Sequence, residues 1–143
     1  MNLVKETDTR RAANATAAGT GDTINGTVID MQNYDAAAFY VMLGTIATGG
    51  VATVRLQQGA LSDGSDMANM TGQSVVFNDT DDNLMAVLEV NRPIKRYVRC
   101  TITRATANVT IDGAVCVLHG GRKKAPAAHS TIRGAVVVGN SPA

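Results

Sequence analysis

The feature that most constrains the fold is a succession of short apolar segments, with turn residues roughly every 8–12 residues. Apolar and polar residues alternate along Val51–Gln58 and along Lys95–Arg104, the period-two pattern of a half-buried strand. Ala36–Ile46 is almost continuously apolar, which fits a strand buried on both faces or a sandwich-core strand. Further strands are predicted at Thr23–Met31, Val75–Asn78, Leu84–Val90 and Val109–Leu118. No segment is a convincing helix, so the pattern predicts an all-β fold, a jelly roll or a related β-sandwich.

Turn residues suggest which of these strands are neighbours. Thr48-Gly49-Gly50 separates Ala36–Ile46 from Val51–Gln58, and the two segments are predicted to form a hairpin. Lys95–Arg104 and Val109–Leu118, joined by Ala105–Asn108, are predicted to form a second hairpin.

The length of 143 residues predicts a single domain with an arm at each end. Residues 1–22 combine mixed charge with an Ala/Asn/Thr/Gly stretch, and we expect an N-terminal arm that lies on a surface or is partly disordered. Residues 23–119 form the predicted sandwich. Residues 120–143 begin with Gly120-Gly121 and contain Pro126, which predicts an extended C-terminal arm. Within it, the apolar Ala135–Val138 can pair with a neighbour's sheet edge or with its own domain.

Charge is distributed unevenly along the chain. Residues 1–90 hold four Lys/Arg and eleven Asp/Glu, whereas residues 91–143 hold nine Lys/Arg and one acidic residue, Asp112. Such a split suggests a surface that docks a partner, or another copy of the chain, in one orientation. The candidate interaction residues are all basic: Arg92, Lys95, Arg96, Arg99 and Arg104 on the second hairpin, and Arg122, Lys123 and Lys124 in the C-terminal arm.

Three interpretations of this basic set compete. Nucleic-acid binding requires Lys/Arg patches that neutralise phosphates, but the net charge is only +1 and Tyr97 is the one aromatic residue interleaved for base stacking. Contact with an acidic protein surface fits better. A solvated face with no partner is a strong competitor for any set of charged residues.

The sequence offers no recognisable catalytic or metal site. Asp79–Asn83 has oxygen ligands at calcium-loop spacing, but Leu84 stands where glycine is needed and Val90 where glutamate is needed. His119 and His129 are ten residues apart without a Cys or His at ligand spacing. No nucleophile elbow is present. We therefore expect a protein that is not an enzyme and needs no cofactor.

The expected redox state of the two cysteines depends on the compartment in which the chain is made. The start of the chain lacks an apolar signal-peptide region, and no apolar run is long enough to span a bilayer, so synthesis in the cytosol is expected. Cys100 and Cys116 are then predicted to be reduced and buried, with a cross-strand disulfide as the alternative.

Four motifs carry a resemblance to a known family. They are Ala38–Gly44 followed by Ala52–Gln58 and Ser62-Asp63-Gly64; Lys95–Thr103; Ala114–Leu118; and Gly120–Pro126. In order and spacing they resemble the small cement, or decoration, proteins of tailed-bacteriophage heads, over most of residues 34–126. The resemblance implies a jelly-roll-type protein bound outside an HK97-type capsid. It also implies dimers or trimers at a symmetry axis that clamp neighbouring capsid subunits.

The expected function is therefore that of a structural virion protein that stabilises contacts between capsid subunits. Its partners would be the major capsid protein and its own copies, with no direct contact to nucleic acid or membrane. It would be made in the bacterial host cytoplasm and located on the outer capsid surface. The alternative is a carbohydrate- or receptor-binding β-sandwich accessory of a phage particle, although three Tyr and no Trp offer few aromatic platforms.

Overall fold

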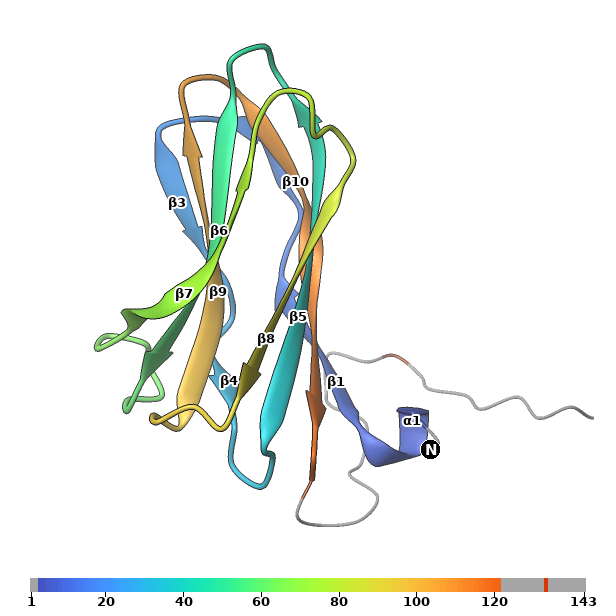
Figure 1. Ribbon diagram of the computed structural model, residues 1–143, viewed down its shortest axis with the longest axis vertical. Helices are drawn as coiled ribbons and strands as arrows, with labels where there is room; N and C mark the ends of the chain where they lie inside the picture. Colours follow the sequence, from blue (N-terminus) through green and yellow to red (C-terminus); the bar gives the residue numbers. More distant parts are fainter. Residues whose placement is uncertain (1–2, 122–132, 134–143) are drawn as a thin grey trace, which may run out of the picture.

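Two antiparallel sheets face each other in a computed structural model that describes residues 3–121 and residue 133 (Figure 1). Sheet I has the strand order β1-β10-β5-β8, with β2 also paired to β10, and sheet II has the order β3-β9-β6-β7, with β4 also paired to β9. The elements are α1 (Leu3–Glu6), β1 (Asp8–Ala13), β2 (Thr16–Gly19), β3 (Asp22–Asn25), β4 (Ile29–Asp30), β5 (Ala36–Ile46), β6 (Val51–Gly59), β7 (Ala68–Phe77), β8 (Met85–Asn91), β9 (Tyr97–Ala105) and β10 (Val109–His119). The predicted all-β sandwich is confirmed.

The core lies between the sheets and is built from small and medium-sized side chains. Alternation along β6 turns Val54 and Leu56 inward, and alternation along β9 turns Ile102 inward, each of them fully buried. Burying a side chain of this kind contributes about 1.5–3 kcal/mol.

Cys100 and Cys116 belong to the same core. Both are free thiols in the structure and both are fully buried, as predicted. Burial raises the pKa of Cys100 to about 11 and that of Cys116 to about 12, because a thiolate is poorly solvated between the sheets.

The two predicted hairpins are wrong. β5 pairs with β10 and β8 in sheet I, whereas β6 pairs with β9 and β7 in sheet II. The turn between them exists, with the Gly50 amide donating to the Ala47 carbonyl at 2.8 Å, but it carries the chain from one sheet to the other. The connection between β9 and β10 crosses between the sheets in the same way. Alternation marks a strand but does not specify its neighbour, and this explains the error.

Strand β7 is longer than the sequence predicts. Residues 59–74 have a loop-like composition, yet the strand begins at Ala68 and pairs with β6. The β6–β7 register shifts between Arg55 and Gln57, and Gly72 on β7 has a φ of 78°. Such a bulge interrupts the period-two pattern, so the strand is hidden in the sequence.

The expected N-terminal arm is also corrected. Within residues 1–22, β1 and β2 pair with β10 at an edge of sheet I, and Ala12 and Ala13 are buried in the core. The alanines are small enough to pack beside the Thr27 amide, which donates to the Ala12 carbonyl at 2.7 Å. The expected C-terminal arm, residues 120–143, lies outside the described residues apart from Gly120, Gly121 and Arg133.

Candidate interaction site

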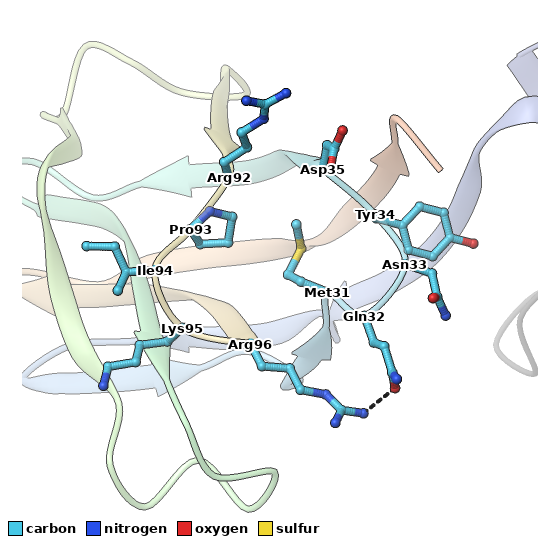
Figure 2. Close-up of a pocket in the computed structure, with 10 residues that line it drawn as sticks. All are labelled: Met31, Gln32, Asn33, Tyr34, Asp35, Arg92, Pro93, Ile94, Lys95 and Arg96. Carbon is cyan, nitrogen blue, oxygen red and sulfur yellow. Dashed lines mark hydrogen bonds between the residues drawn. The ribbon is translucent and has the colours of Figure 1, made fainter. Parts of the chain in front are cut away.

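An open hollow lies at the end of the sandwich drawn lowest in Figure 1. Two connections between the sheets, residues 31–35 after β4 and residues 92–96 after β8, line an open groove of about 860 Å³ (Figure 2). They are held together by backbone hydrogen bonds: the Met31 amide donates to the Arg96 carbonyl at 2.9 Å, and the Arg92 amide donates to the Asp35 carbonyl at 2.7 Å. The groove thus has a rigid backbone frame.

Arg96 forms one wall of this groove. Its guanidinium makes two hydrogen bonds of 2.9 Å to the Asp30 carboxylate and a third, of 2.5 Å, to the Gln32 side chain. The guanidinium carbon also lies 5.2 Å from the centre of the Tyr97 ring. The hydrogen bonds from Arg96 lower the pKa of Asp30, and those same bonds raise the pKa of Arg96. Arg96 is therefore engaged within the molecule.

The loop between β8 and β9 presents a different surface. Ile94 is 89% exposed, the most exposed large apolar side chain among the described residues, and Arg92 and Lys95 flank its Pro93-Ile94 tip. Within residues 3–121, neither Arg92 nor Lys95 forms an ion pair. Figure 2 shows their side chains projecting in different directions, so they flank an apolar tip rather than converging on one anion. A partner surface with an apolar pocket and an acidic rim would complement this loop.

Arg99 and Arg104 lie away from the groove. Arg99 is on the outer face of sheet II, where its Nε donates to Gln57 at 2.8 Å. Arg104 is only 4% exposed and binds the Asp22 carboxylate and the carbonyls of Ala17 and Val109. The prediction of an interaction role for Arg104 is therefore corrected, because the side chain is buried.

A sequence signal for this burial exists. Arg104 has the same parity as Cys100 and Ile102 on β9, so strict alternation turns it inward. The remaining predicted residues, Arg122, Lys123 and Lys124, lie outside the described part of the chain.

The acidic loop that resembles a calcium site has a structural use. Asp79 accepts a hydrogen bond from the Gly49 amide, and Asp82 accepts one from the Ile46 amide, both at 2.7 Å. These bonds tie the β7–β8 connection to the β5–β6 turn. Among residues 3–121 and 133, no group of three or more His, Cys, Asp or Glu side chains is placed to hold a metal ion.

The outer face of sheet I is a second candidate surface, which the sequence reasoning missed. Tyr40 and Met42 of β5 point outward beside Val87 and Met85 of β8, and these last two are 56% and 49% exposed. Sheet II is polar in comparison, with Thr23 and Thr103 hydrogen-bonded across its outer face at 3.1 Å. The sequence signal for this surface was the nearly continuous apolar run Ala36–Ile46, which supplies apolar side chains to both faces of sheet I.

Among the described residues, no helix is both long and apolar enough to cross a membrane.

Comparisons with known proteins support the fold and leave the family open. No model of a known protein family matches the chain, and no curated protein sequence matches it. Among solved structures, the chain is similar to one from the disulfide-linked pili of Bacillus endospore appendages, with a TM-score of 0.51 and 15% identity. The similarity covers 83% of this chain and 92% of that one. That neighbour is a pilus protein and not a phage decoration protein, so it supports only the β-sandwich part of the expected resemblance.

Proposed function

We propose that this chain is a non-enzymatic structural protein that attaches in several copies to the outer surface of an HK97-type phage capsid and strengthens contacts between capsid subunits. The observation that carries the proposal is the loop of residues 92–95, in which an exposed isoleucine is flanked by two cations without an ion pair in the described part of the chain. The choice of a phage capsid as the particle rests on the sequence resemblance to phage cement proteins. Synthesis in the bacterial cytoplasm and a final position on the virion surface are parts of the same proposal.

This function would require only non-covalent binding and no chemical step. Transfer of Ile94 from water into a partner's pocket contributes about 1.5–3 kcal/mol, and the rigid frame of the groove keeps the entropic cost of docking low. Arg92 and Lys95 would mainly accelerate and orient the encounter with an acidic rim, an effect that salt screens. Several copies bound around one axis would add avidity.

The test is co-sedimentation of the purified protein with phage heads that lack it, at low and high salt. We expect saturable binding that weakens with salt, and at least a tenfold loss of affinity for Ile94→Asp, equivalent to about 1.4 kcal/mol. Leu61→Asp is the matched control, because Leu61 is an exposed loop residue outside the groove and should retain full binding. Absence of binding at either salt concentration would refute the capsid proposal.

The solved neighbour favours a second candidate, a subunit of a self-assembling fibre. Cys100 and Cys116 are buried, so within the described residues such a fibre would have to assemble without disulfide links. Negative-stain electron microscopy of the concentrated protein separates the two candidates, since fibres formed without capsids would favour this second one.

A further inference from the structure

The edges of the two sheets are protected unequally. Along the β1 edge of sheet I lie Arg10 and Arg11, and its register with β10 shifts between Arg11 and Ala13. In sheet II, the β3 and β4 edge is split into pieces of four and two residues, and the β7 edge is bulged. Charges, short strands and bulges are the features that keep an edge from pairing with another chain.

Strand β8 lacks most of these protections. Its seven residues pair with β5 in an unbroken register, from Met85 opposite Met42 to Asn91 opposite Ala36. Within residues 3–121, no strand pairs with its other side. Every second backbone amide and carbonyl of β8 therefore points away from β5 and can receive a further strand.

The side chains around β8 define what such a strand must look like. Ala86, Leu88 and Val90 face the core, while Met85, Val87 and Glu89 face outward, and the Glu89 carboxylate lies 2.6 Å from His119 Nε2 of β10. A strand added beside Met85 and Val87 would have apolar surroundings on both sides, and the Glu89 part of the edge would be polar on its outer face. The added strand should therefore be apolar at consecutive positions instead of at alternate ones.

The sequence contains a segment of this kind after the described residues 3–121. Ala135–Val138 provides four consecutive apolar residues, and thirteen residues, 122–134, separate it from the described end of the domain. β10 and β8 both end at the same end of sheet I, as shown by His119 opposite Ala36 and Ala36 opposite Asn91. A segment that follows β10 and turns back along a β8 edge would be antiparallel to β8.

We propose that the β8 edge binds the C-terminal segment, Ala135–Val138, of a second copy of this chain as an added antiparallel strand. The connections of residues 31–35 and 92–96 lie at the end of sheet I where β10 and β8 end. The thirteen-residue linker extends to about 43 Å, whereas its own β8 edge is roughly 10 Å from β10. The linker is thus long enough for the segment to reach the β8 edge of a neighbouring molecule. The inference deepens the proposed function, on which it rests for the presence of several copies.

The test is disulfide trapping between singly substituted chains, without any capsid present. One chain carries Val87→Cys on the β8 edge, and the other carries Val136→Cys or Val137→Cys, since consecutive strand residues face opposite sides. Ser74→Cys, exposed on the β7 edge of sheet II, is the matched receptor control. The native Cys100 and Cys116 are buried and do not interfere.

We expect a cross-linked heterodimer that forms at least tenfold faster with Val87→Cys than with Ser74→Cys. Equal rates for the two receptors would overturn the proposal. A chain carrying both Val87→Cys and the tail cysteine should cross-link between molecules, and exclusive cross-linking within single molecules would show that the segment occupies its own edge.

A second measurement uses chains without new cysteines. Light scattering should show that Val137→Pro converts the oligomer to a monomer, because proline cannot donate to the strand ladder, while Ala127→Pro in the linker leaves the oligomer intact. An unchanged oligomer in Val137→Pro would also overturn the proposal. If the oligomer forms through β8 but heads are not bound, only the capsid proposal fails.

Discussion

Among single residues, Arg104 connects the two sheets of the sandwich through its side chain. Its position on β9 places a guanidinium at the inner side of the sandwich, where it meets Asp22 and two backbone carbonyls. Since Val109 begins β10 in sheet I while Arg104 lies in sheet II, the side chain joins the two sheets. The hydrogen bonds from Arg104 also lower the pKa of Asp22. Arg104 is therefore a structural residue of this fold.

Replacement of Arg104 by methionine should destabilise the protein. The change leaves the carbonyls of Ala17 and Val109 without a side-chain donor, and an unsatisfied buried acceptor costs about 1–3 kcal/mol. Urea unfolding followed by circular dichroism should show this loss in the free energy of unfolding. Arg55→Met is the control, because Arg55 is exposed on β6 and its loss should change stability by less than about 0.5 kcal/mol. Equal effects of the two substitutions would contradict the structural role.

At the scale of secondary-structure elements, the break between β3 and β4 joins the two sheets at a second point. Gly26 lies in this break, and its amide donates to the Cys100 carbonyl of β9 at 2.8 Å. A Cβ atom at Gly26 would come within 2.6 Å of the Ala12 carbonyl oxygen of β1 and 2.8 Å of the Cys100 carbonyl oxygen. Only a residue without a side chain permits β1 of sheet I and β9 of sheet II to approach this closely.

Gly26→Ala should therefore loosen the attachment of β1. Backbone atoms of two strands would have to move, and we expect a loss of about 1–3 kcal/mol in the free energy of unfolding. Hydrogen exchange should accelerate in residues 8–13 before the rest of sheet I. The neighbouring Thr27→Ala is the control, since Thr27 is exposed and its backbone bond to Ala12 is kept. Unchanged stability and exchange in Gly26→Ala would show that the close approach is not needed.

At the scale of the whole molecule, the charge split of the sequence does not become a simple division into two faces. Arg96 pairs with Asp30 and Arg104 pairs with Asp22. Basic residues of the segment 91–143 therefore neutralise acidic residues of the segment 1–90. Arg92 and Lys95 are exposed at the groove and form no ion pair within residues 3–121, and Ile94 lies between them in the sequence. The basic surface available for a partner at the groove is consequently a small mixed patch, smaller than the basic face that the sequence predicts.

Stability should depend on pH in the acid range. Arginine partners lower the pKa values of Asp22 and Asp30, and backbone amide donors lower those of Asp63 and Asp66, all from an ordinary value of 3.8. Depressed pKa values in the folded state stabilise it fully above the unfolded value and progressively less as pH falls through the folded values. The midpoint of urea unfolding should be steady from pH 7 to pH 5 and fall below about pH 4.

The matched variant for this pH dependence is Asp66→Asn. It should be less stable at pH 7, because the amides of Ala60 and Leu61 lose a charged acceptor, and its stability should change less with acid. A wild-type midpoint that stays constant down to pH 3 would contradict the assignment of these carboxylates.

Local properties of this protein could be predicted from the order of its residues. Period-two alternation identified β6 and β9, because strand geometry couples each residue's direction to its immediate neighbours, and short apolar segments bounded by turn residues located β8 and β10. The same reasoning placed Cys100 and Cys116 in the interior. The exposed Ile94 loop was anticipated only through its flanking basic residues.

The pairing of strands and the contacts between charged side chains became known from the folded molecule. Arg104 and Asp22 are 82 positions apart and Arg96 and Asp30 are 66 apart, and no local pattern specifies such contacts. The assignment of β5 and β6 to different sheets, and of β1 to the sandwich, likewise depends on shape complementarity between distant segments. The apolar outer face of sheet I arises because β5 is central there, a placement that its apolar run permits but does not dictate.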